Sequence, residues 1–253
     1  MYPTLFSAGP VEIRSWGVML FISFILGIWL SQRRCRLQGI NPQIVPDLAV
    51  VILICAIIGS RINYAVEHPK EFRSFFDFLA IWRGGLTFYG GFILATIGSI
   101  AYLKKKKISI TLMMDIIAPA LALGLCLTRI GCFLNGCCFG KPTKFFLGVK
   151  FPPGSIPYFY FPGEKIHPTQ LYESAFGLFM FFVLRRLERV NLPRGALFFV
   201  FTGGYGVWRF SIDFLRFYEK QVRIGPLVET QIISIIVIIV SIICLRYLYL
   251  KRS

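Results

Sequence analysis

The stretch ITLMMDIIAPALALGLCLTRIGCFLN, residues Ile110–Asn135, decides the class of fold. It is predominantly apolar and longer than the ~20 residues that a helix needs to cross a bilayer. Two charged residues interrupt it, Asp115 and Arg129. Charges inside membrane segments cost free energy and usually mark functional sites. The residues that follow, GCCFGKPT, are rich in turn formers, so the stretch predicts a membrane helix that ends in a site.

The rest of the chain has the same apolar character. Of its 253 residues, 56% are hydrophobic and only 16% are charged, whereas charged residues make up about a quarter of soluble domains. Six further apolar runs have near-spanning length: Val11–Ser31, Asp47–Val66, Leu86–Leu103, Pro168–Leu187, Gly195–Phe217 and Pro226–Leu250. We therefore predict an all-α integral membrane protein with seven transmembrane helices, forming a single polytopic domain over residues 1–253.

The basic residues set the predicted orientation. A net charge of +16 would suit nucleic acid, but the charges fall in short clusters between apolar runs, so no nucleic-acid partner is predicted. The tightest clusters lie in short loops and at the C-terminus: Arg33, Arg34 and Arg36, then Lys104 to Lys107, then Arg185, Arg186, Arg189 and Arg194, and finally Arg246, Lys251 and Arg252. Such clusters mark the cytoplasmic side. The N-terminus is then outside, the C-terminus is cytoplasmic, and irregular outer loops near 67–85 and 137–167 contribute to the site.

Four arginines lie inside predicted spans: Arg61, Arg129, Arg209 and Arg216. In YGVWRFSIDFLRF, Arg209, Asp213 and Arg216 are spaced so that they share one helix face. The orientation places Arg129 near the outer end of its span and Arg209 somewhat deeper in its own, so the two are expected to face each other at similar depth. Four converging arginines would bind an anion, and the guanidinium fork matches a phospholipid phosphate. The alternative is internal ion pairing that fixes the packing of the helices.

Two further blocks carry polar or small residues near the outer boundary. The paired glycines of GGLTFYGG, residues 84–91, indicate either close helix packing or close approach to a ligand, with the Tyr89 hydroxyl in the site. HPTQLYES, residues 167–174, brings together His167, Gln170, Tyr172 and Glu173. Each is an ordinary cap or interface anchor by itself, and together they suggest part of a site.

Three cysteines lie close together, Cys132, Cys137 and Cys138. A zinc site of four protein ligands is not predicted, since the only histidines are His68 and His167. No metal and no cofactor are therefore expected. A disulfide between two of the three cysteines stays open if they face an oxidising side.

The motifs also resemble a known family. LTRIGCFLNGCCFGK, GSRINYAV, GGLTFYGG, HPTQLYE, YGVWRFSIDFLR and the opening FSAGPVEIRSWGVML are similar to blocks of the bacterial prolipoprotein diacylglyceryl transferases, in the same order. The resemblance implies an enzyme of the bacterial plasma (inner) membrane with its active site toward the outer side. It implies transfer of the diacylglyceryl group of phosphatidylglycerol to the lipobox cysteine thiol of a prolipoprotein. A thioether forms and glycerol phosphate leaves.

The resemblance also assigns roles to residues. Arg129 and Arg209 match the two essential arginines of the family, and we expect them to bind the phosphate and stabilise it as it leaves. Tyr89 stands where the family has a histidine and is included as a catalytic residue. Substrate binding is assigned to Arg61, Gly131, Asn135, Gly140, His167, Gln170, Tyr172, Glu173, Asp213 and Arg216.

Besides Tyr89, four further positions depart from the family pattern. Cys132 replaces an asparagine, Cys137 a glutamate, Trp16 a tyrosine and Asp213 a glutamate. The departures concern the acceptor side more than the phosphate-handling arginines. Two alternatives therefore stay open: a related transferase with a different acceptor, and a non-catalytic phospholipid-binding membrane protein.

Overall fold

The computed structural model describes residues 3–8, 11–71, 76, 78, 84–85, 87–219 and 223–251. The chain divides into two units, each described by itself. Unit 1 comprises Met1–Leu30 and Met114–Ser253, and unit 2 comprises Ser31–Met113. The candidate site described below lies in unit 1.

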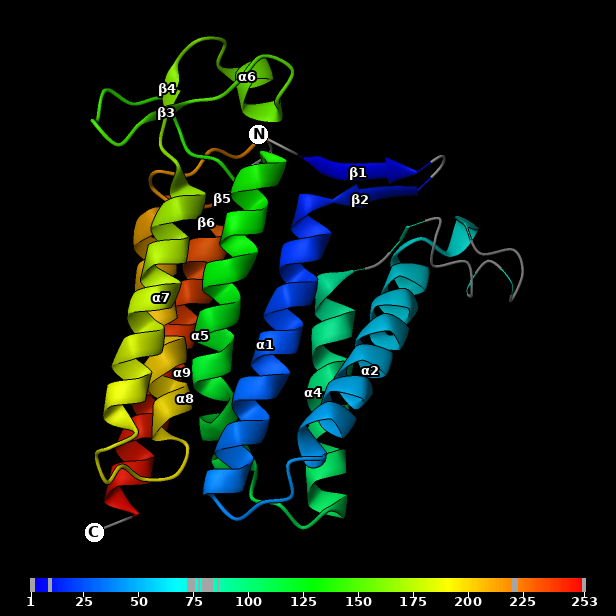
Figure 1. Ribbon diagram of the computed structural model, residues 1–253, viewed down its shortest axis with the longest axis vertical. Helices are drawn as coiled ribbons and strands as arrows, with labels where there is room; N and C mark the ends of the chain where they lie inside the picture. The colour runs from blue at the N-terminus through cyan, green and yellow to red at the C-terminus, as the bar shows by residue number, and fades with distance from the viewer. Residues whose placement is uncertain are drawn as a thin grey trace. The chain divides into compact units, whose positions relative to one another are not determined.

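Seven helices of 17 to 26 residues lie in the part of the chain that the structure describes (Figure 1). They are α1 (Ser15–Leu37), α2 (Ile44–Glu67), α4 (Phe88–Lys105), α5 (Ile110–Asn135), α7 (Thr169–Leu187), α8 (Ala196–Ile212) and α9 (Glu229–Leu250). Four of these, α1, α2, α5 and α9, are long and apolar enough to cross a membrane. The structure therefore agrees with a mostly helical membrane protein.

Several predicted helix boundaries differ from the structure, three of them for a clear local reason. The first run was expected to begin at Val11, but Val11–Arg14 is strand β2, paired antiparallel with β1 (Thr4–Ala8). Its alternating apolar and charged residues fit the period of a strand. The sixth run ends at Ile212 rather than Phe217. The last begins at Glu229, because β5 (Arg223–Ile224) and β6 (Leu227–Val228) form a tight hairpin before it.

The core of unit 1 lies between α5, α7 and α8, which Figure 1 shows running together with α9. Its buried side chains are Ala118, Ala122, Met180, Leu184, Leu197 and Phe201. Asp115 in α5 accepts hydrogen bonds from the backbone N–H groups of Gly195 (2.6 Å) and Phe198 (3.2 Å). Asp115 therefore supplies hydrogen-bond acceptors for backbone N–H groups at the start of α8, which have no partner within the helix. Its place in an apolar run has a structural reason.

Gly177 lies where α7 and α5 are in close contact. A Cβ on Gly177 would lie 2.8 Å from the Cys126 backbone nitrogen and 2.9 Å from the Ala122 carbonyl oxygen. We expect Gly177→Ala to lower the free energy of unfolding by about 1–3 kcal/mol, because backbone atoms cannot yield without moving a helix. Gly124→Ala on α5 is the matched control, since nothing lies within 4 Å of its added Cβ. Thermal unfolding in detergent compares the two variants, and equal effects would contradict the packing.

The segment between α5 and α7 forms a small folded layer beyond one end of these helices (Figure 1). It contains β3 (Val149–Lys150), α6 (Ile156–Tyr160) and β4 (Lys165–Ile166), with β3 and β4 paired antiparallel. Phe139, Phe151 and Ile166 are buried at its centre. These two aromatics form a small core, whereas Phe146 and Phe159 are about four-fifths exposed, at 78% and 80%.

Unit 2 is built on the pairing of α2 with α4. A Cβ on Gly90 would lie 2.3 Å from the Gly59 carbonyl oxygen, and one on Gly91 would lie 2.3 Å from the Ser60 hydroxyl oxygen. The second glycine pair of GGLTFYGG thus serves close helix packing. The short 3-10 helix η1 (Pro69–Glu71) follows α2. In the predicted outer loop near 67–85, the structure describes residues 67–71, 76, 78 and 84–85.

Candidate functional site: an arginine–carboxylate cluster

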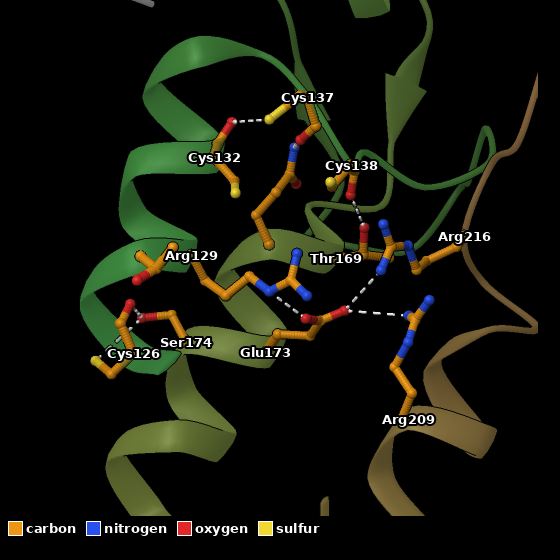
Figure 2. Close-up of polar contacts among 12 residues, drawn as sticks. Cys126, Arg129, Cys132, Cys137, Cys138, Thr169, Glu173, Ser174, Arg209 and Arg216 are labelled. Carbon is orange, nitrogen blue, oxygen red and sulfur yellow. Dashed lines mark hydrogen bonds and ion pairs between the residues drawn. The ribbon is translucent and has the colours of Figure 1, made fainter. Parts of the chain in front are cut away.

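One buried carboxylate collects three arginines in unit 1 (Figure 2). Glu173 on α7 is 1% exposed and pairs through Oε2 with Nε of Arg129 on α5. Its Oε1 lies 3.2 Å from Nη1 of Arg216 and 3.5 Å from Nη1 of Arg209 on α8. Three of the four predicted arginines therefore converge. Glu173, predicted as one of the substrate-binding residues, is the residue that joins them.

Arg209 is fixed by a second carboxylate. Its Nη1 lies 3.1 Å from Oδ1 of Asp213, and its Nη2 donates to the Tyr218 hydroxyl at 2.6 Å. Asp213 in turn accepts hydrogen bonds from the hydroxyls of Tyr218 and of Thr230, in the first turn of α9. Tyr218 and Thr230 were not among the predicted site residues. Neither carries a charge or stands in a recognisable motif, so their role depends on the tertiary fold.

Arg216 reaches the cluster from a turn, so the prediction that it shares a helix face with Arg209 is wrong. The helix ends at Ile212, and Arg216 instead forms an isolated β-bridge with Gly140. A Cβ on Gly140 would lie 2.7 Å from the His167 carbonyl oxygen and 2.8 Å from that of Leu215. Glycine at this position therefore lets three chain segments meet beside the cluster.

The cluster keeps a positive charge. Three guanidinium groups face two carboxylates, Glu173 and Asp213, all of them buried or nearly so. Among the described residues, the ionic partner of Arg129 is Glu173 at its Nε, which leaves both Nη groups of Arg129 for a ligand. Guanidinium Nη groups bind phosphate oxygens in pairs. The geometry therefore suits an anion with several oxygens.

The start of α7 fixes the chain that follows α5. The Thr169 hydroxyl donates to the Cys138 carbonyl (2.8 Å), and the Gln170 amide nitrogen donates to the Cys137 carbonyl (2.7 Å). The Gln170 Oε1 is buried and lacks a hydrogen-bond partner within the described ranges. His167 Nδ1 lies 3.3 Å from the Tyr172 hydroxyl, and burial lowers the pKa of His167, which favours its neutral form.

The three neighbouring cysteines come together at the end of α5. The sulfur atoms of Cys132, Cys137 and Cys138 all lie within 4.8 Å of one another, and all three are free thiols. Hydrogen bonds from the Cys132 and Cys137 thiols lower the pKa of Cys138 below its usual range, and the charges of Arg216 and Arg129 add to this. The cysteines and the arginine cluster are therefore electrostatic neighbours.

Two other predicted residues surround this end of α5. Gly131 packs against α1, since its added Cβ would lie 2.9 Å from the Met19 Cβ. Asn135 lines a pocket of about 360 Å³ together with Pro3, Thr4, Arg14 and residues 152–156. Its side chain also interacts with the Cys137 thiol. The pocket thus adjoins the cysteines through Asn135.

Arg61 and Tyr89 belong to unit 2. The Arg61 Nε donates to the Phe78 carbonyl (2.9 Å), and its Nη1 donates to those of Gly84 (2.5 Å) and Gly85 (3.0 Å). Arg61 therefore holds the chain that leads into α4. Tyr89 lies in the first turn of α4 with about half of its surface exposed, at 52%. Their assignment to the site stays a prediction.

These features define a helical membrane protein with a buried cluster of three arginines and two carboxylates. A model of the prolipoprotein diacylglyceryl transferase family matches residues 3–247, and the chain belongs to this family. A protein of Synechococcus elongatus is 34% identical over 99% of this chain and 89% of its own length, and one of Clostridium tetani is 32% identical over 96% of each. Both are named phosphatidylglycerol–prolipoprotein diacylglyceryl transferase. The predicted family is confirmed.

Proposed function

We propose that this protein transfers the diacylglyceryl group of phosphatidylglycerol to the lipobox cysteine thiol of prolipoproteins. The observation that carries the proposal is the convergence of Arg129, Arg209 and Arg216 on Glu173, in a chain that matches the family over nearly its whole length. Relatives from distant bacteria bear the name of this activity. These matches favour it over a non-catalytic lipid-binding protein.

The arginine cluster handles the donor. As the bond between the glycerol carbon and the phosphate oxygen breaks, its electron pair stays on the phosphate, where negative charge grows. Fixed guanidinium groups in a water-poor site stabilise that charge more than water does. Glu173 and Asp213 orient the arginines before the substrate arrives. The free Nη groups of Arg129 then bind the phosphate.

The acceptor sulfur attacks the same glycerol carbon, so a C–S bond forms as the C–O bond breaks. The thiol proton leaves before or during the attack, because a thiolate is the effective nucleophile and an ordinary cysteine has a pKa near ~8.5. The products are a thioether on the lipobox cysteine and glycerol phosphate. The arginine cluster by itself activates the leaving group, and the thiol needs a separate means of deprotonation.

The proposal includes the seven-span topology in a bacterial plasma membrane, with the N-terminus outside and the site on the outer side. Its support is the polarity of α7, which begins beside the cluster and ends with Arg185 and Arg186. Basic residues at a helix end mark the cytoplasmic side. A C-terminal green fluorescent protein fusion should fluoresce, and an alkaline phosphatase fusion there should be inactive. The reverse pattern would overturn the orientation.

The activity is tested with purified protein in phosphatidylglycerol vesicles and a peptide carrying a lipobox cysteine. Mass spectrometry should detect the peptide enlarged by one diacylglyceryl group through a thioether. The same peptide with Cys→Ser should remain unmodified, and vesicles of phosphatidylcholine should give no product. If a family enzyme modifies the cysteine peptide and this protein does not, the proposed acceptor is wrong.

A further inference from the structure

The three clustered cysteines have no role in the arginine chemistry, yet their positions are fixed. Cys132 lies in the last turn of α5, and Gly136, directly after the helix, is in a left-handed conformation (φ 79°). Cys138 is also left-handed, with φ 60°, which is uncommon for a residue other than glycine. Such backbone conformations persist at functional sites because the surroundings enforce them. Here Thr169 and Gln170 of α7 hold the carbonyls of Cys138 and Cys137.

The sulfur geometry suits a small thiophilic cation. In a tetrahedral zinc site with Zn–S bonds of ~2.3 Å, the sulfurs are about 3.8 Å apart. The sulfurs of Cys132, Cys137 and Cys138 already lie within 4.8 Å of one another, so modest side-chain movement closes the site. Among the residues that the structure describes, the group consists of thiols alone, which favours zinc or copper(I) over harder cations.

The number of ligands points to a reactive site. Structural zinc sites use four protein ligands, whereas catalytic sites use three and leave the fourth position open. The shortage of histidines argues against a zinc site with four protein ligands, but not against a site with three cysteines and one open position. Copper(I) would be satisfied by three thiolates and would leave no position for a substrate. Zinc keeps one.

The residues around the three cysteines indicate which ligand the open fourth position of the zinc would bind. Arg129 lies one turn from Cys132 on α5, and Glu173 lies one turn from Thr169 and Gln170 on α7. The cysteine group and the phosphate-binding group are therefore adjacent, as Figure 2 shows. Three thiolates and one Zn²⁺ carry a net negative charge, which the positive arginine cluster accommodates.

We propose that Cys132, Cys137 and Cys138 bind a zinc ion whose fourth position takes the acceptor cysteine of the prolipoprotein. The inference rests on the proposed function, because it requires a thiol acceptor. The acceptor thiol replaces a water molecule on the zinc and loses its proton to solvent, since a zinc-bound thiol is deprotonated. Its sulfur lone pair then attacks the glycerol carbon, the C–O electron pair leaves with the phosphate, and the thioether, a weaker ligand, departs.

Metal content is the first test. Protein purified under reducing conditions and exposed to zinc alone should retain about one zinc ion per chain by elemental analysis. The triple variant Cys132→Ser, Cys137→Ser and Cys138→Ser should retain little. Cys244→Ser, a half-buried cysteine of α9, is the matched control and should behave as the wild type. The triple change can unfold the protein. The zinc content of the wild type and that of the single variant Cys138→Ser therefore provide independent measurements.

Cobalt(II) supplies the second test, because its absorption reports the ligands. The protein should show thiolate-to-cobalt bands that shift when the lipobox peptide is added and stay unchanged with the Cys→Ser peptide. Three results would overturn the proposal: the wild-type protein binds no zinc, it binds only copper(I), or its mass is two hydrogens lower because two of the three cysteines form a disulfide.

Activity separates the two proposals. Undiminished transfer by chelator-treated, zinc-free protein would overturn the zinc site and leave the proposed function intact. A cobalt spectrum that responds to the peptide without any transfer would support the site and remove the proposed function.

Discussion

Arg129→Lys should lower kcat for thioether formation by roughly 10²–10³-fold. Lysine keeps the positive charge but loses the planar fork, of which Nε binds Glu173 and both Nη groups are left for the phosphate. The developing charge on the leaving group then loses paired donors in the transition state. KM for phosphatidylglycerol should change less than kcat, because the charge that attracts the lipid is retained. Initial rates at several lipid fractions in mixed vesicles measure both constants.

Arg185→Lys is the matched control for this substitution. Arg185 lies near the end of α7 that is far from Glu173. It is exposed and pairs with Glu188 at 2.7 Å. Its kinetics should equal those of the wild type. A non-catalytic lipid-binding protein needs only the charge, so equal performance by Arg129→Lys would contradict the transition-state role.

Glu173→Gln should cost stability as well as activity. The carboxylate is 1% exposed and pairs with all three arginines. Glutamine keeps the shape, removes the negative charge and turns an amide donor toward guanidinium donors. Breaking a buried ion pair in this way costs about 3–5 kcal/mol. For a protein of this size, the apparent Tm in detergent should fall by roughly 10 °C. Transfer activity should also fall, because Arg129 and Arg209 lose their shared anchor.

Glu188→Gln provides the comparison, since its partner Arg185 is exposed and such pairs contribute little. Its Tm should stay close to that of the wild type. If Glu173→Gln unfolds at the same temperature as Glu188→Gln, the cluster is not held together by this carboxylate.

The helices were largely predictable because apolar run length decides them. The predicted run Ile110–Asn135 coincides with α5, and Pro168–Leu187 differs from α7 by one residue. Errors occurred where local pairing overrides hydropathy. Val11–Arg14 forms a strand, and the chain leaves α8 at Asp213, where Arg209, Tyr218 and Thr230 all contact its carboxylate.

The site was predictable in part. Arg129 and Arg209 stand out as charges in apolar runs, and their convergence follows from helix direction. The central role of Glu173 was missed, because nothing in the sequence shows which arginines one acid can reach. Thr169 was missed because it acts on the Cys138 backbone, a contact between distant segments. The assembly of three cysteine sulfurs likewise depends on the left-handed turn at Cys138.

The most direct test of the account follows one oxygen atom. Phosphatidylglycerol is labelled with ¹⁸O at the oxygen that joins the diacylglyceryl carbon to phosphorus, and both products are analysed by mass spectrometry. If the arginine cluster stabilises a departing phosphate while sulfur attacks carbon, all of the label should appear in glycerol phosphate, in an amount equal to the thioether peptide. Label found in diacylglycerol, or glycerol phosphate released without a thioether product, would contradict the mechanism.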